Sequence, residues 1–316
     1  MTISSGLGSQ FGFVAESTPG TFVAPTKFLE FTGETLTYHR DRIVRKGMRA
    51  GRRLSYGWAA GVQWVDGDVT VELGPQGSAL LFKHWLGAVN TTGVNPYTHT
   101  VTPGSPDALS LTMQVNKPDV GGVDRVFSYL GCSITSGELS CKVNEFLTGK
   151  FSVYGMHEDT SQALATASYP ANYSPFVFTQ GSLQIAAAAY DITEFTFKGD
   201  NGLKTGRHFM RATTPERPKL SKEADWRQYT GTLRSDFIDL TAYNRFVNGT
   251  EAALVMTFNA GASAQMTITT NVRFDGDTPQ VSGPQLLEQS LPFVCTSGTS
   301  DAAAVTIAIV NADATP

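Results

Sequence analysis

The sequence lacks the features by which membrane and secreted proteins are usually recognised. No run of about 18 apolar residues, the length that a membrane-spanning helix requires, occurs among its 316 residues. Residues 1–13 contain neither the charged start nor the continuous apolar stretch of a secretion signal. We therefore expect no membrane insertion by this chain, and synthesis in a cytosol-like compartment.

Cysteine is scarce, and its spacing excludes two further classes of protein. Cys132, Cys141 and Cys295 do not have the spacing of a metal site, and their odd number does not form a complete disulfide framework. In a chain without a secretion signal, we expect such cysteines to be reduced and packed.

Catalytic motifs are also missing. No nucleophile elbow, phosphate-binding loop or dinucleotide-binding glycine motif occurs. The histidines are scattered without a zinc-binding pair: they are His39, His84, His99, His157 and His208. The segment 157–159 is better explained as a charged solvated turn than as a metal cluster, and 198–202 as a turn than as a calcium loop. Carboxylate pairs that hydrolyse glycosides meet only in space, so the sequence selects none. We predict no catalytic residue, no metal and no cofactor.

The residues that are abundant favour β-structure. Hydrophobic residues make up 41% of the chain, which is enough for a sizeable core, and 31 glycines punctuate short runs rich in Val and Thr. Apolar and polar residues alternate at 29–38 and at 192–197, as in strands with one buried face. Further strands are expected at 64–73 and 226–233. The predicted fold class is mainly β.

The same order of elements occurs twice along the chain. A strand, a basic segment, a second strand and a short helix are followed by further strands in each half. The first helix is expected at 79–86 with Ser78 as its cap, and the second at 240–248 with Asp239 as its cap. Gly87 and Gly249, which end them, lie 162 residues apart. This order predicts an internal duplication, with a longer helix-to-strand connection in the first half.

Composition suggests where the boundaries of this duplication lie. Residues rich in Gly, Ser, Thr and Pro open the chain, and a stretch rich in Ala, Ser, Tyr and Pro separates the halves. The predicted regions are an N-terminal arm at 1–27, a first domain at 28–157 with a basic loop at 39–58, a linker at 158–176, and a second domain at 177–316 with a basic loop at 200–224.

Positive charge is confined to two windows in the predicted loops. They contain 13 of the 24 basic residues but only 2 of the 28 acids, so the rest of the chain carries 11 minus 26, or −15. The basic residues of the first window are Arg40, Arg42, Arg45, Lys46, Arg49, Arg52 and Arg53, and those of the second are Lys204, Arg207, Arg211, Arg217, Lys219 and Lys222. Basic segments thus extend from an acidic body.

Three roles for these long loops compete. They could be solvated and without a role, they could bind nucleic acid through phosphates, or they could dock onto an acidic surface of another copy. A nucleic-acid reader usually has a basic domain or interleaved aromatic residues, whereas this chain is acidic outside the loops. An acidic body with basic projections is self-complementary. We therefore favour docking between copies.

Several segments resemble a known family. Residues 8–21, residues 31–36 followed by 46–52, the central 129–134 and the closing 287–293 are similar to segments of siphophage tail tube proteins. Together they cover most of the chain, and the N-terminal fifth is the most specific part. The resemblance implies tandem tube domains, each a two-sheet antiparallel β-sandwich or partial barrel flanked by a short α-helix.

The resemblance also implies a structural role in the virion. Copies would form rings that stack through the long loops, so the thirteen basic residues named above are predicted inter-ring contacts. The hollow tube, assembled in the host cytoplasm, would pass double-stranded DNA without binding it specifically, and would meet a tape measure protein and tail-end proteins. Duplicated members close as trimers with pseudo-sixfold symmetry and single-domain members as hexamers, so the repeat favours a trimer.

A rival hypothesis is a β-sandwich protein that binds or hydrolyses carbohydrate at a virion or cell surface. A cleft lined by Trp58, Trp64 or Trp226 would favour it. A nucleic-acid-binding module is the third alternative, and salt-dependent binding to DNA would support it.

Overall fold

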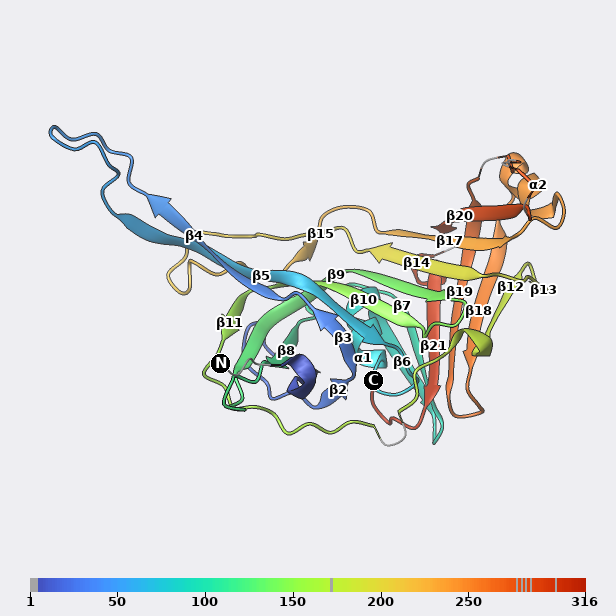
Figure 1. The fold of residues 1–316 in the computed structure, drawn as a ribbon, viewed down its shortest axis with the longest axis horizontal. Coiled ribbons are helices and arrows are strands. Elements are labelled where there is room, and N and C mark those ends of the chain that lie inside the picture. Colours follow the sequence, from blue (N-terminus) through green and yellow to red (C-terminus); the bar gives the residue numbers. More distant parts are fainter. Residues whose placement is uncertain are drawn as a thin grey trace.

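The protein is described by a computed structural model that covers residues 5–170, 173–276, 278–279, 281, 283–284, 286–298 and 300–316. The molecule is elongated, with an antiparallel β-sheet body and a long hairpin that projects from one end (Figure 1). The fold class is therefore mainly β, as predicted.

The first half contains the body's first helix and the strands that surround it. Its elements are β1 (Phe11–Ala15), β2 (Lys27–Leu29), β3 (Phe31–Glu34), β4 (Thr37–Val44), β5 (Trp58–Glu72), α1 (Ala79–Leu86), β6 (Gly87–Gly93), β7 (Tyr97–Pro103), β8 (Leu111–Asn116), β9 (Val126–Lys142), β10 (Thr148–Gly155) and β11 (His157–Asp159).

The second half repeats this composition of elements. They are β12 (Gly181–Ile185), β13 (Ala188–Ala189), β14 (Glu194–Asp200), β15 (Leu203–Lys204), β16 (Lys222–Glu223), β17 (Gln228–Asp236), α2 (Thr241–Asn248), β18 (Ala252–Asn259), β19 (Gln265–Phe274), β20 (Glu288–Thr296) and β21 (Val305–Asn311). Three short 3-10 turns lie at Gly6–Gly8, Phe178–Gln180 and Asp301–Ala303.

The strands of the two halves have the same neighbours. In the first half the spatial order is β2, β1, β8, β9, β10, β5 and β3. In the second half it is β13, β12, β18, β19, β20, β17 and β14. The strands that end the halves, β11 and β21, pair with β9 and β19. The β6–β7 hairpin is the longer connection expected in the first half, and β7 pairs with β21.

A shared strand pair joins the two halves into one sheet. β9 is long enough to pair with β8 and β11 near its start and with β10 and β14 near its end. Gly131, with φ at +66°, lies in β9 between these two parts, at a backbone conformation that glycine adopts without steric cost. β14, from the second half, runs antiparallel to β9 from Lys142↔Glu194 to Ser136↔Asp200. The hydrophobic core is therefore one cluster with residues from both halves.

Both helices end at the glycines that the sequence analysis identified. α1 occupies the predicted residues, and Gly87 follows it at a φ of +112°. Ser78 is at the N-cap position, but its hydroxyl donates to Gly74 O and does not cap the helix. α2 begins at Thr241, one residue later than expected, and Asp239 Oδ1 accepts from the Thr241 N–H at 2.7 Å.

Two segments expected to be peripheral are packed against the body. Phe11 and Phe13 of β1 are fully buried, and β1 lies between β2 and β8, so this part of the predicted N-terminal arm belongs to the sheet. The predicted linker lies along the first half: Ala165 N–H donates to Gln114 Oε1, and the hydroxyl of Tyr173 donates to Glu72 O. Glycine and serine content concealed the alternating Phe-Gly-Phe pattern of β1.

The three cysteines are free, and Cys132 and Cys141 are buried, which confirms their expected packing. Among the described residues, no helix is both long and apolar enough to cross a bilayer.

Candidate assembly surfaces

The first basic window is the outer end of the projecting β-hairpin. β4 and β5 pair as far as Val44↔Trp58, and only 45–57 form a loop, so the predicted structureless loop at 39–58 is partly wrong. Residues 40–60, which we call the hairpin arm, are all exposed (Figure 1). Both faces of these outer strands meet solvent, so the sequence carries no alternation that would predict them.

The cations of the hairpin arm are free of acidic partners. None of its seven basic residues forms an ion pair in the part of the chain that the structure describes. Arg42 lies over the Trp58 ring at 5.3 Å, and Arg52 over the Tyr56 ring at 3.8 Å. Their charges therefore remain available to another surface.

The hairpin arm also exposes large apolar side chains, which the charge count did not reveal. Ile43, Met48, Leu54 and Trp58 are all exposed. Such side chains clustered on a projection are typical of a surface that another molecule covers. The sequence did contain a signal for this surface, because large apolar residues occur inside a strongly basic window.

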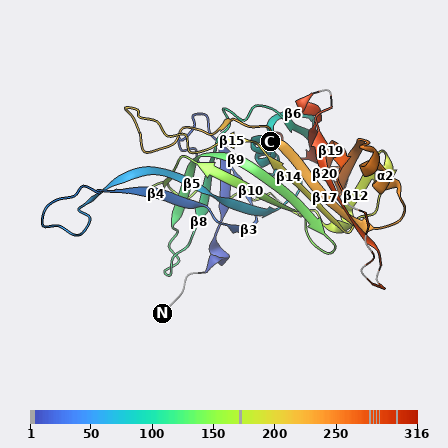
Figure 2. The same ribbon diagram turned by 90° about the horizontal axis from the view of Figure 1, so that it is seen from above.

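The second basic window projects to the same side but is packed (Figures 1 and 2). β15 and β16 close a loop over residues 205–221, and Arg207 pairs with Lys219 as a further bridge. The loop lies against the inner part of β5, where Gln63 N–H donates to Glu216 O at 2.8 Å. The predicted loop at 200–224 is therefore a short ladder with a loop that contacts the base of the hairpin arm.

Several cations of the second loop stabilise the loop itself. Arg207 Nη1 donates to Leu220 O at 2.8 Å. Arg211 Nη2 donates to Thr214 O at 2.8 Å and to Arg217 O at 2.9 Å. Lys222 pairs with Asp107 at 3.5 Å.

The structure thus places the thirteen predicted contact residues in two different settings. Arg40 and Arg42 are in β4; Arg45, Lys46, Arg49, Arg52 and Arg53 are in the loop of the hairpin arm; Lys204 is in β15, Arg207, Arg211, Arg217 and Lys219 are in the second loop, and Lys222 is in β16.

A short repeated motif relates the two windows. Arg45-Lys46-Gly47-Met48-Arg49-Ala50 and Arg207-His208-Phe209-Met210-Arg211-Ala212 are 162 residues apart and identical at four positions. Both methionines are fully exposed. The spacing equals that of the two helix-ending glycines, so this motif is a further sign of duplication.

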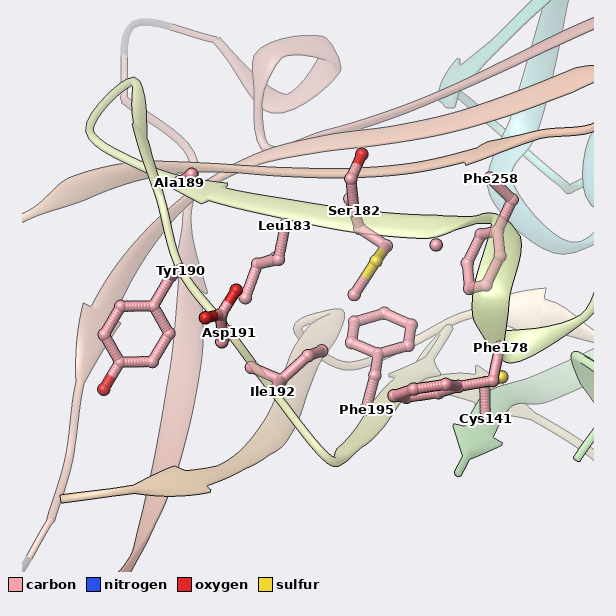
Figure 3. Close-up of a pocket in the computed structure, with 12 residues that line it drawn as sticks. Cys141, Phe178, Ser182, Leu183, Ala189, Tyr190, Asp191, Ile192, Phe195 and Phe258 are labelled. Carbon is pink, nitrogen blue, oxygen red and sulfur yellow. The ribbon is translucent and has the colours of Figure 1, made fainter. Parts of the chain in front are cut away.

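An apolar pocket of about 390 Å³ lies where the β12–β13 hairpin meets β14. The rings of Phe178, Phe195 and Phe258 gather at one end, and Tyr190 and Asp191 lie at the other (Figure 3). Its described lining contains no histidine or lysine to act as a base beside a nucleophile. Exposed Ser182 and Ala189 line it beside buried Phe195 and Phe258, so the pocket opens to the surface.

The two segments considered as metal loops are not the solvated turns that the sequence predicted. His157–Asp159 forms β11, which pairs with β9, and residues 198–200 belong to β14. Burial and the charge of Arg217 lower the pKa of His157 to about 4. Asn201, fully buried, donates from Nδ2 to Trp85 O and Ile134 O. Among the described residues, no group of three or more His, Cys, Asp or Glu is placed to hold a metal ion.

The three tryptophans of the carbohydrate hypothesis lie in different settings. Trp58 is on the hairpin arm, and Trp64 stacks on His39 and donates to Asp66 Oδ2. Trp226, 88% exposed, lines a groove of about 840 Å³ with Arg227 and Asp225.

Comparison with known proteins identifies the family of the chain. The family profile described as "phage tail tube protein" matches residues 6–295. The chain therefore belongs to the phage tail tube protein family, whose members are structural proteins of the virion tail. This confirms the resemblance found in the sequence. Curated protein sequences gave no match.

Proposed function

We propose that this chain is the major tail tube subunit, whose copies assemble into stacked rings around a hollow conduit for DNA, without catalysis or a cofactor. The observation that carries the proposal is the hairpin arm, which extends far from the body with exposed apolar side chains and seven cations that form no ion pair with the described residues. An exposed projection that carries unpaired charge and apolar side chains supports docking onto another copy.

Contacts between rings gain strength from their number. An exposed ion pair contributes only ~0–1 kcal/mol, so a single arm would bind weakly. Burial of Met48 or Leu54 would add roughly 1.5–3 kcal/mol each. Several arms on one ring then act together, because each later contact is effectively intramolecular.

Within a ring, the repeat supports a trimer with pseudo-sixfold symmetry over a hexamer. Each chain has two halves with equal strand order, joined side by side through β9 and β14. The outer edge of β3 and β4 pairs with no strand in the described part of the chain. An open edge of this kind is a template for a strand of a neighbouring copy. Three tandem chains, each with two tube domains, would close one ring.

The acidic remainder of the chain suits a DNA conduit. A net charge of −15 outside the two basic windows would repel phosphates that pass within a screening length of ~8 Å. Double-stranded DNA would pass without being held. A tape measure protein inside the tube and proteins at the tail ends are the other partners, and assembly would take place in the host cytoplasm.

The second candidate is a carbohydrate-binding surface protein, which the exposed Trp226 in its groove favours. Binding of glycans by the soluble monomer, abolished by Trp226→Ala, would support it.

Charge reversal in the hairpin arm tests the main proposal. The variant Arg49→Glu/Arg52→Glu/Arg53→Glu should fold normally, because all three side chains are exposed, but should form no tubes in negative-stain electron micrographs. Arg125→Glu/Arg234→Glu/Arg273→Glu makes the same charge change at exposed positions of the body, where each ion pair lost is worth only ~0–1 kcal/mol, and should leave tubes intact. Tubes of normal length from the arm variant would contradict the stacking role, and a wild-type protein that never polymerises would contradict the whole proposal.

A further inference from the structure

Helix α1 packs against β6, β7 and β9 of the first half, and β14 of the second half completes its cover at Trp85. Trp85 is fully buried and lies across the β9–β14 seam, where its Nε1 donates to Gly199 O at 3.2 Å. Its ring packs edge-on against Phe197 of β14, with 6.0 Å between centroids. The contact of α1 with β14 is therefore part of the junction between the two halves.

Two glycines make room for this contact. Gly137 of β9 and Gly199 of β14 are directly paired across the seam. A Cβ atom would lie 2.6 Å from the Trp85 ring at Gly137 and 2.8 Å from it at Gly199, which is too close for either. The seam is thus shaped to receive a side chain from α1.

Helix α2 is the counterpart of α1 but has no such cover. It follows β17 as α1 follows β5, and Val247 stands 162 residues after Trp85. Val247 is 58% exposed, and Ala242 is the only buried residue of α2. Ile238 and Leu240, which lead into α2, are also exposed. We call Ile238, Leu240 and Val247 the α2 patch.

The first-half strand that corresponds to β14 lies too far across the sheet to cover the α2 patch of its own chain. β3 is this counterpart, because the pair Phe31↔Val71 in the first half corresponds to Phe195↔Leu233 in the second. β3 is separated from β17 by β5, β10, β9 and β14. β14 has strands on both edges, whereas β3 pairs only with β5 in the described part of the chain.

We infer that the α2 patch is the docking surface for a second copy of this chain, whose β3 edge packs against α2 as β14 packs against Trp85 of α1. Each chain then has an uncovered helix on one side and an unused strand edge on the other. Such a contact is head-to-tail, and it closes into a ring when the rotation between copies is suitable. The inference rests on the proposed function, because it specifies the contact that would build each ring.

Substitutions that favour the helix while making the patch polar provide the test. Leu240→Asp puts an acid at the N-cap and Val247→Lys puts a cation in the last turn, so neither should weaken α2. We expect the double variant to sediment as a folded monomer at concentrations where wild type forms rings, with association at least ~100-fold weaker. The matched control is Val120→Lys, which changes a side chain of equal exposure (55%) in the β8–β9 turn and should assemble normally.

The comparison with the arm variant separates this inference from the proposed function. Arg49→Glu/Arg52→Glu/Arg53→Glu should still form single rings, because its α2 patch and β3 edge are intact. Normal tubes from Leu240→Asp/Val247→Lys would overturn the inference alone, whereas a wild type without rings or tubes would overturn the proposed function.

Mixing tests the head-to-tail arrangement. Leu240→Asp/Val247→Lys retains the β3 edge, so it should join wild-type copies at one side only and stop ring closure when added in excess. A variant that neither joins wild type nor blocks its assembly would overturn the pairing of α2 with β3. Assembly of wild type would be followed by sedimentation, and incorporation by a labelled variant.

Discussion

The two halves of this chain have the same strand order, but different parts of each are left exposed. In the first half α1 is buried and the basic hairpin arm is free. In the second half α2 is exposed and the basic loop is packed on β5. The second half thus completes the first, by supplying β14 to α1 and a loop to the base of the arm, and is itself left incomplete. One completed and one open half suit the proposed addition of further copies.

The free elements lie at opposite ends of the molecule. Figure 1 shows the hairpin arm at one end of the long axis and α2 at the other. Contacts through the arm and contacts through α2 can therefore form independently, as the proposed stacking between rings and the proposed closure within a ring require.

The largest effect should come from removing the side chain that joins α1 to β14. Trp85→Ala leaves a cavity in the fully buried seam and should lower the free energy of unfolding by about 3–5 kcal/mol. Val247→Ala, at the equivalent position of exposed α2, should change it by less than ~0.5 kcal/mol. Urea unfolding of protein diluted below the concentration at which rings form would keep assembly out of both measurements. Equal losses for the two substitutions would show that the helices do not differ as described.

A second difference between the helices should appear as pH dependence. Burial lowers the pKa of His84 in α1 to about 3, and both of its ring nitrogens lack a hydrogen-bond partner in the described structure, whereas Phe246 occupies the equivalent position in α2. Below its ordinary pKa of ~6.5 the unfolded chain binds a proton that the folded chain excludes, so stability falls as pH falls. Between pH 7 and pH 4.5 this contributes a loss of about 2–3 kcal/mol.

His84→Phe should remove this part of the pH dependence and leave the part due to His157. Chemical unfolding of both proteins at pH 7 and pH 4.5 measures how the free energy of unfolding changes with pH. The change should be larger for wild type than for His84→Phe, and an equal change would mean that His84 is protonated in the folded protein at pH 4.5.

Local patterns in the sequence predicted much of the fold. Alternation identified strands such as β14, where one face is buried, and glycine at 87 and 249 located both helix ends within a residue. These signals are local, because a strand or a helix end is decided by a few neighbouring residues. The outer strands of the hairpin arm have no buried face, so alternation could not reveal them.

The pairing between distant segments could not be predicted from the sequence. Nothing in residues 204–222 indicates that Glu216 O will meet Gln63, or that Arg211 will hold its own loop. Charge counting therefore treated the two basic windows as equivalent contact sites. Whether an arginine is free or structural depends on which carbonyl oxygens the fold brings within its reach.

The smallest of the expected effects tests this distinction between the two windows. Arg49 and Arg211 are equivalent in the repeated motif, but only Arg211 donates to backbone carbonyls within its loop in the described structure. Arg211→Ala should lower the free energy of unfolding by about 1 kcal/mol and speed proteolysis within 205–221, since these partly exposed hydrogen bonds are lost. Arg49→Ala should leave both unchanged and instead reduce tube length. If Arg49→Ala destabilised the monomer as much as Arg211→Ala, the hairpin arm would not be the free element of the pair.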